Sequence, residues 1–278
     1  MACGSVIKTA LKQRVKHSMM SRAKAAPSDR VDSVNRILTY HSVGERTHDM
    51  NVTCDQFRAQ MEWLATTQSV IRVADAARGE PGIAISFDDG YRDNLTNAAP
   101  VLESLDLPAT VFVVAGCLGG FLAHDEPIEA NRLMSCDEIR ALEAMGVEIG
   151  AHTLSHVRLA QVSEREQFHE IVESVKRLEA CLGHAVSGFA YPYGSFLDYN
   201  ALSTRIVREQ GLEYALSNRY GANGPARDRW ALRRIWVDAS DTLEVFQAKV
   251  DGRLDRMAWM DSEVGIRARR VLNRVLRT

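Results

Sequence analysis

The sequence predicts an α/β fold in which a parallel sheet is closed, or nearly closed, into a barrel. Short apolar runs rich in β-branched residues alternate about seven times with segments whose apolar residues recur at helical spacing. Several of the helical segments begin with a capping box, in which Ser or Thr is followed three residues later by Glu or Gln. Polar side chains suited to catalysis follow two of the apolar runs, and parallel α/β folds keep their ligands at such strand ends.

The predicted strands are short runs of β-branched and aromatic residues between turn-forming residues. Several of them contain few charged residues, which is typical of strands buried in a parallel sheet. In chain order these runs are residues 36–40, 70–73, 83–87, 109–114, 147–151, 188–191, 214–217 and 232–237.

Helices are predicted between these strands, and three of them begin with capping boxes at Thr53, Ser135 and Ser163. The helix after Ser163 is the longest, and its apolar residues continue at helical spacing toward Gly183, where a glycine suits a helix end. Further helices are expected at residues 95–105 and 201–210.

The chain has the composition of an ordinary globular protein, with 278 residues of which 46% are hydrophobic and 25% charged. We expect one main domain, residues 36–260, between a basic N-terminal extension at 1–35 and a basic amphipathic C-terminal tail at 261–278. Lys and Arg dominate both ends, whereas the residues between them are net acidic. Such ends suit peripheral contact with an anionic membrane, solvated tails or packing against the barrel, and the pattern leaves these alternatives open.

Cysteine usage and the amino terminus predict a cytoplasmic protein, with peripheral contact at the inner membrane surface as a variant. The five cysteines form no C-x-x-C and are odd in number, so we expect no disulfide framework. No stretch reaches the roughly 18 consecutive apolar residues of a membrane span, and charged residues interrupt the amino terminus where a signal peptide would be apolar. We expect no nucleic-acid partner, and the sequence does not predict an oligomeric state.

Two adjacent carboxylates, Asp88 and Asp89, follow the apolar run at residues 83–87 and precede Gly90. Like charges side by side are costly unless a cation neutralises one of them. At the carboxyl edge of a sheet, one carboxylate can bind a metal ion while its neighbour stays free as a base. The remaining metal ligands are therefore expected elsewhere in the chain.

His152 and His156 follow the predicted strand at residues 147–151. They stand four residues apart, so one helical turn after the strand would aim both imidazoles the same way. With Asp89 they form a two-histidine, one-carboxylate set, which leaves coordination positions open for water and substrate. We expect Zn²⁺, although the same set accepts Co²⁺, Ni²⁺ or Fe²⁺.

Asp88 is then expected to be the general base that takes a proton from a water made acidic by the metal. The alternative is that Asp88 does not take part in proton transfer and only orients a histidine that binds the metal.

Three motifs give the chain a family resemblance: SFDDG at residues 86–90, HTLSH at 152–156 and FAYPYG at 189–194. The chain resembles the polysaccharide deacetylase family, the NodB-homology domain of metal-dependent carbohydrate esterases. The resemblance covers roughly residues 37–237 and implies a distorted (β/α) barrel with seven or eight mostly parallel strands. It also implies a hydrolase that removes N-acetyl groups from an N-acetylated hexosamine in a glycan or glycan precursor.

The resemblance implies catalytic roles for Tyr193 and His41. In the family, a backbone N–H at the position of Tyr193 helps to stabilise the oxyanion beside the metal, and a buried aromatic in a Pro-Gly turn is the alternative. The family's usual carboxyl-terminal Leu-x-x-His is absent. His41 resembles the acid histidine of the permuted poly-N-acetylglucosamine deacetylases, which protonates the departing amine; the alternative is a histidine that caps the first strand.

One position departs from the family pattern, because Ala190 stands where the third motif usually carries an arginine that orients the base carboxylate. Arg233 or Arg234, on the last predicted strand, is the expected replacement. His124, in the loop at residues 121–131, is expected to be a solvated side chain, with substrate contact as the alternative. O-acetyl esterase activity, hydrolysis of another C–N bond and a non-catalytic glycan-binding role all remain alternatives.

Overall fold

The computed structural model of the chain describes residues 33–44, 50–261 and 265. The predicted basic extension and basic tail lie almost wholly outside this part of the chain. Their boundaries and their membrane contact therefore remain predictions. No described helix combines the length and the apolar composition that a membrane span requires.

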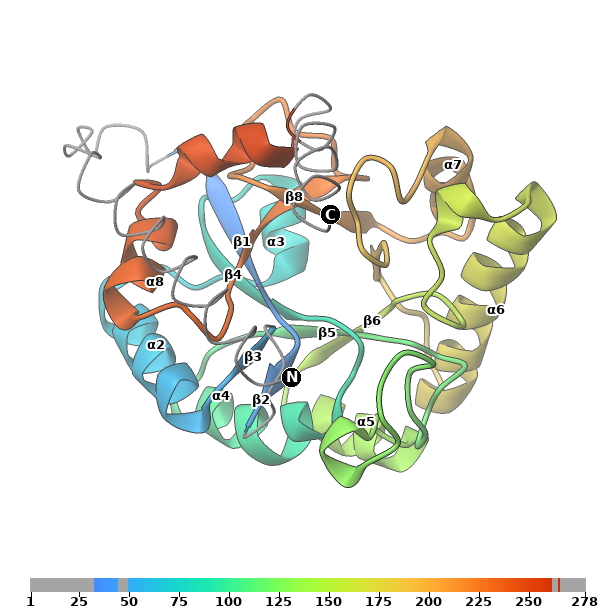
Figure 1. Cartoon of the computed structure of the whole chain (residues 1–278), viewed down its shortest axis with the longest axis horizontal. Coiled ribbons are helices and arrows are strands. Elements are labelled where there is room, and N and C mark those ends of the chain that lie inside the picture. The colour runs from blue at the N-terminus through green and yellow to red at the C-terminus, as the bar shows by residue number, and fades with distance from the viewer. Residues whose placement is uncertain (1–32, 45–49, 262–264, 266–278) are drawn as a thin grey trace, which may run out of the picture.

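Seven parallel strands form a closed barrel whose order follows the sequence, and the last strand pairs with the first (Figure 1). The predicted distorted (β/α) barrel with seven or eight mostly parallel strands is thereby confirmed. The strands are β1 (Asn35–Tyr40), β4 (Gly82–Phe87), β5 (Thr110–Val113), β6 (Glu148–Ala151), β7 (Gly188–Ala190), β8 (Tyr214–Tyr220) and β9 (Leu232–Trp236).

Two further features complete the sheet structure. The register between β8 and β9 shifts between Leu216 and Tyr220, which distorts the barrel there. A separate parallel pair, β2 (Ser42–Val43) and β3 (Asn51–Val52), follows β1.

Helices surround the barrel on its outer side (Figure 1). Their apolar faces are buried in the main core, as Phe57, Met61 and Leu64 show for the first of them. The α-helices are α2 (Cys54–Thr67), α3 (Val73–Arg78), α4 (Ala99–Ser104), α5 (Cys136–Ala144), α6 (Glu164–Leu182), α7 (Ala201–Glu209) and α8 (Leu243–Val250). Shorter helical segments are η2 (Asn94–Ala98), η3 (Glu129–Asn131), η4 (Leu159–Gln161) and η5 (Asp255–Asp261).

Capping residues begin the helices where the sequence predicts them. Thr53 and Ser135 form reciprocal capping boxes at α2 and α5. Ser163 caps α6 by accepting a hydrogen bond from the N–H of Glu166. Gly183 ends α6 at a φ of +85°, which a glycine adopts without a steric penalty.

The strand predicted at residues 70–73 is wrong. Only Val70 pairs with the sheet, through a single bridge to Ile83, and α3 begins at Val73. The alanine-rich segment favours a helix, and Gly79 ends that helix in the left-handed region.

The sequence predicts no disulfide framework, but the structure contains a disulfide, which joins Cys136 and Cys181 across a separation of 45 residues. Cys136 opens α5 and Cys181 lies near the end of α6. The number and spacing of the cysteines in the sequence do not show that the helices carrying Cys136 and Cys181 pack side by side. The predicted cytoplasmic location rested partly on the cysteine count. Disulfides persist mainly in oxidising compartments, so the cysteines no longer support that location, which stays a prediction.

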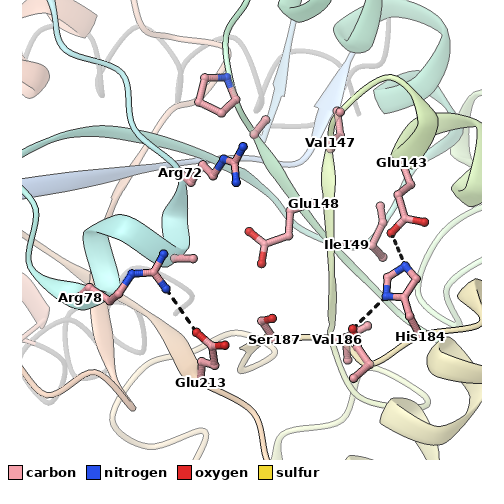
Figure 2. A pocket seen from close by; sticks show the side chains of 15 residues that line it. Arg72, Arg78, Glu143, Val147, Glu148, Ile149, His184, Val186, Ser187 and Glu213 are labelled. Carbon is pink, nitrogen blue, oxygen red and sulfur yellow. Dashed lines mark hydrogen bonds and ion pairs between the residues drawn. The ribbon is translucent and has the colours of Figure 1, made fainter.

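A pocket of about 520 Å³ lies at the amino ends of the central strands (Figure 2). Its lining includes Ala109, Val147, Ser187 and Glu213, each of which directly precedes a strand. Glu148, the first residue of β6, points into this pocket. The pocket is therefore at the opposite end of the barrel from the carboxyl ends of the strands.

Candidate metal centre and active site

The residues predicted to form a catalytic site gather at the carboxyl ends of the barrel strands. They come from four separate connections, so only the closed sheet brings them together. His41 follows β1, Asp88 and Asp89 follow β4, His152 and His156 follow β6, and Tyr193 follows β7.

Asp89, His152 and His156 form the predicted cluster, and one ligand atom from each lies within 4.8 Å of the others. The Nε2 atoms of His152 and His156 are 3.6 Å and 3.3 Å from Asp89 Oδ1. All three side chains are buried or nearly so. Two imidazoles and one carboxylate are a donor set that suits a divalent transition metal.

The protonation of His152 explains why this cluster fits a cation. Its Nδ1 lies 2.7 Å from the Ala190 carbonyl oxygen, which can only accept, so Nδ1 carries the proton. Burial lowers the pKa of His152 to about 4, despite the opposing charge of Asp88. Neutral His152 therefore turns an unprotonated Nε2 toward Asp89 Oδ1, and two facing acceptors call for a cation between them.

Asp89 supports the same conclusion. Its Oδ1 is buried without a hydrogen-bond partner in the part of the chain that the structure describes. Burial raises the pKa of Asp89 although His41 and His152 oppose the rise. A buried carboxylate oxygen without a donor is costly, and coordination to a metal would satisfy it.

Backbone geometry directs Asp89 toward the histidines. The N–H of Asp88 still bonds to the Tyr40 carbonyl at 3.0 Å, but Asp89 and Gly90 adopt φ values of +73° and +81°. A Cβ at Gly90 would lie 3.2 Å from Val113, so both the backbone conformation and the space favour glycine there. The chain therefore turns sharply as soon as β4 ends.

The helical turn expected at residues 152–156 is wrong. Thr153 and His156 have φ values of +62° and +59°, and Glu170 of α6 accepts hydrogen bonds from the N–H groups of Leu154 and Ser155 at 3.0 and 2.9 Å. The tight turn still brings the two imidazoles together, with ring centroids of His152 and His156 5.1 Å apart.

Arg234 holds Asp88 by a bidentate ion pair. Its Nη1 and Nη2 donate to the two carboxylate oxygens at 2.7 and 2.6 Å, and both side chains are buried. Arg233 instead donates to the Tyr220 carbonyl at 3.1 Å, because neighbouring residues of a strand point to opposite faces. Of the two arginines expected to replace the one absent at Ala190, Arg234 and not Arg233 therefore pairs with Asp88.

The ion pair sets the charge of Asp88. Burial alone would raise the pKa of this carboxyl, but Arg234 and His152 outweigh burial and hold the pKa well below its usual range. Asp88 is therefore ionised at neutral pH. A carboxylate that accepts two bonds from one guanidinium retains further lone pairs for a substrate or water.

His41 lies close enough to the site to act on it electrostatically. Its positive charge would lower the pKa of both Asp88 and Asp89. The Asn94 side chain donates to the His41 carbonyl at 2.8 Å, whereas His41 Nδ1 is buried without a partner among the described residues. Asn94 thus binds the main chain of His41, and no described residue forms a hydrogen bond with Nδ1 of the His41 ring.

Tyr193 lies at the edge of the site and is not the buried aromatic of the alternative interpretation. The residue is 40% exposed, and its ring lies 4.8 Å from the His156 ring, centroid to centroid. The Arg158 guanidinium sits 3.5 Å from the Tyr193 ring centroid and is paired with Asp198. The residue has a φ of +59°, so the chain turns at this point.

Three contacts at the site were missed at the level of sequence. Glu170 shapes the histidine turn, the Ala190 carbonyl fixes the His152 tautomer, and Arg158 covers Tyr193. His124 is exposed, as expected of a solvated side chain, and its ring centroid lies 5.4 Å from that of His156. No spacing in the sequence indicates any of these contacts, since each joins segments that the fold brings together.

A closed parallel barrel with a two-histidine, one-carboxylate centre at its carboxyl end is the architecture of a barrel enzyme. Residues 75–215 match the profile of the polysaccharide deacetylase family, and the chain belongs to that family.

Individual relatives agree with this assignment. The chain is 25% identical to a Bacillus subtilis protein named as a polysaccharide deacetylase, over 77% of this chain and 75% of the relative. It is 23% identical to poly-β-1,6-N-acetyl-D-glucosamine N-deacetylase of Staphylococcus epidermidis, over 80% of this chain and 79% of that protein. The structure of IcaB from Ammonifex degensii shares the fold with a TM-score of 0.68 and 24% identity, covering 80% of this chain and 97% of that one.

Proposed function

We propose that the chain is a metal-dependent hydrolase that removes the N-acetyl group from an N-acetylated hexosamine in a glycan or glycan precursor. The observation that carries the proposal is the convergence of acceptor atoms from Asp89, His152 and His156 beside an ionised Asp88. A divalent cation bound by these three residues supplies Lewis acidity to the acetamide carbonyl and to water. We propose Zn²⁺, and Co²⁺, Ni²⁺ or Fe²⁺ suit the same donors.

Asp88 is the general base of the proposed reaction. It accepts a proton from the water that attacks the acetamide carbon. Arg234 keeps the carboxylate ionised and fixes its orientation through two hydrogen bonds. Because both side chains are buried, the base is held in one position before substrate arrives.

His41 and Tyr193 complete the proposed machinery. His41, whose ring Nδ1 has no hydrogen-bond partner among the described residues, protonates the departing amine as the carbon–nitrogen bond breaks. The backbone N–H of Tyr193 stabilises the negative charge that develops on the acetamide oxygen. Acetate and a free amino sugar are the products.

The named activity of the staphylococcal relatives supplies the first substrate to test. Those proteins are poly-β-1,6-N-acetyl-D-glucosamine N-deacetylases, so oligomers of β-1,6-linked N-acetylglucosamine are the starting point. Acetate release is measured before and after chelation of metal, then after restoring Zn²⁺, Co²⁺, Ni²⁺ or Fe²⁺ separately. An O-acetylated sugar is assayed in parallel to compare ester and amide hydrolysis.

The expected result is acetate release that disappears with the metal, returns with at least one of the four ions and is lost in Asp88→Asn. Hydrolysis that survives complete chelation would exclude the metal-dependent mechanism. Release from the ester alone would assign an O-acetyl esterase. Binding of the oligomer without any hydrolysis in the metal-loaded protein would assign a glycan-binding role instead.

A further inference from the structure

The loop between β5 and α5 is fastened to the segment that carries the catalytic carboxylates. Its base is closed by hydrogen bonds from Gly119 N to Met134 O and from Leu133 N to Gly120 O, both 2.9 Å. The N–H of Met134 also bonds to the Gly90 carbonyl at 3.0 Å. Because Gly90 directly follows Asp89, the loop has a fixed position relative to the metal ligands.

The tip of this loop is a tight turn pinned on both sides. The Asp125 N–H bonds to the Leu122 carbonyl at 3.1 Å, and Leu122 is buried in a cluster with Tyr91 and Leu133. The Tyr91 hydroxyl donates to Asp125 Oδ2 at 2.6 Å. His124 lies between these two anchors, so its backbone is fixed although its side chain is exposed.

The His124 ring lies beside the metal centre without belonging to it. It is 5.4 Å from the His156 ring, close to the 5.1 Å that separates His152 and His156. It is nevertheless absent from the group whose ligand atoms lie within 4.8 Å of one another. No hydrogen bond to its ring nitrogens occurs within residues 33–44, 50–261 and 265, so the ring offers a donor and an acceptor to the mouth of the site.

A second ring meets His156 at the mouth. Tyr193 also contacts His156, at 4.8 Å between ring centroids, and is held by Arg158. The site edge thus combines an exposed aromatic ring with an exposed imidazole whose nitrogens have no hydrogen-bond partner in the described part of the chain. Sugars present apolar C–H faces and hydroxyl groups together, so this pair of side chains matches their chemistry.

We propose that His124 is a substrate-binding residue that hydrogen-bonds a hydroxyl or amide group of the sugar whose acetamide is hydrolysed, and that the Tyr91–Asp125 hydrogen bond positions it. This inference rests on the proposed N-deacetylase function. The role belongs to binding, since Asp88 and His41 already provide the base and the acid.

The test compares His124→Ala, His124→Gln and Tyr91→Phe with a control, His169→Ala, which removes an exposed histidine from α6. KM and kcat are measured with β-1,6-linked N-acetylglucosamine oligomers, and metal content is measured for each protein. Loss of one hydrogen bond is worth roughly 0.5–1.5 kcal/mol, which corresponds to about a two- to tenfold rise in KM. We expect that rise in His124→Ala, with kcat within about twofold and metal content unchanged.

The other variants separate binding from structure. His124→Gln retains a donor and an acceptor and should recover part of the affinity. Tyr91→Phe keeps the buried ring but removes the hydroxyl that donates to Asp125, so it should raise KM by less than His124→Ala. The control should match the parent protein.

Three outcomes would overturn the inference. An unchanged KM in His124→Ala, with a parent enzyme that is active, removes the binding role and leaves the proposed function intact. Loss of metal from His124→Ala would make His124 a ligand rather than a substrate contact. A parent protein that is loaded with metal but releases no acetate would remove the proposed function and this role together.

Discussion

The strand β6 joins two carboxylate sites whose hydrogen bonding is opposite, a half-buried one at Glu148 and a buried one at Asp89. At its amino end, Glu148, whose side chain Figure 2 shows in the pocket, accepts from the Thr110 hydroxyl at 2.9 Å and the Tyr214 hydroxyl at 3.1 Å. Just beyond its carboxyl end, His152 faces Asp89, whose Oδ1 has no donor in the described part of the chain. One short strand therefore separates a satisfied carboxylate from an unsatisfied one.

The contrast shows which end of the barrel holds the chemistry. Neutral hydroxyl groups donate to both carboxylate oxygens of Glu148, and burial raises the pKa of this carboxyl. At the carboxyl end, the acceptor Nε2 of neutral His152 faces the Asp89 carboxylate, and a metal ion bound between them would satisfy both. In barrel folds the amino-terminal face commonly serves stability and the carboxyl-terminal face carries function.

The largest effect should come from removing the unsatisfied carboxylate. Asp89→Ala should lose bound metal and reduce acetate release to background, because two histidines alone hold a metal weakly. Glu148→Gln is the matched control at the other end of β6 and should keep metal and turnover. Metal content by elemental analysis, measured with initial rates, checks both; equal metal loss in the two variants would remove the distinction between the two ends.

A second large effect is expected at Asp88, where charge is used in the reaction. Asp88→Asn keeps the shape but removes the base, so kcat should fall by about 10²–10⁴-fold. Metal content should stay near that of the parent, since Asp88 does not belong to the three-residue cluster. Loss of metal along with activity would instead make Asp88 a part of the metal site.

The free energy of unfolding should fall by different amounts when the carboxylates Asp88 and Glu148, at opposite ends of the barrel, each lose one hydrogen-bonding partner. Arg234→Met leaves the buried Asp88 charge unpaired and should lower the free energy of unfolding by about 3–5 kcal/mol. Tyr214→Phe removes one neutral donor from Glu148 and should cost about 1–3 kcal/mol. Urea denaturation of both variants gives the comparison.

The double variant Asp88→Asn with Arg234→Met is the control for the larger effect. It removes the charge together with its partner, so it should recover much of the stability lost in Arg234→Met. If Arg234→Met cost no more than Tyr214→Phe, the buried ion pair would contribute less than its geometry indicates.

Much of the fold and the three-residue cluster could be predicted because the relevant signals are local. Capping residues mark the helix starts at Thr53 and Ser135, and apolar runs mark the strands. Asp89, His152 and His156 stand at the ends of such runs, and a parallel sheet places those ends at one edge. Local sequence patterns therefore predict most of the helices and strands, and the parallel arrangement predicts that the three residues lie at one edge of the sheet.

Other parts of the site depend on contacts between distant segments. Choosing Arg234 over Arg233 requires knowing which face of β9 points into the barrel, and a shift of one residue reverses that choice. The turn before His156 is held by Glu170, which reaches it from α6 and accepts from the N–H groups of Leu154 and Ser155. The position of His124 depends on the bond between Tyr91 and Asp125. Each of these follows from packing and has no local signature.

The smallest expected effect is a pH dependence of stability that arises from Glu148. Burial raises its pKa above the usual value of 4.5, so the folded state binds the proton more tightly than the unfolded state does. This contribution favours folding below pH 4.5 and is lost as the pH rises through the raised pKa of the folded state. Glu148→Gln cannot lose that proton, so its free energy of unfolding relative to the parent should increase over this interval. Chemical denaturation of both proteins at several pH values tests this, and parallel pH curves would mean that Thr110 and Tyr214 fully compensate the burial of the charged carboxylate.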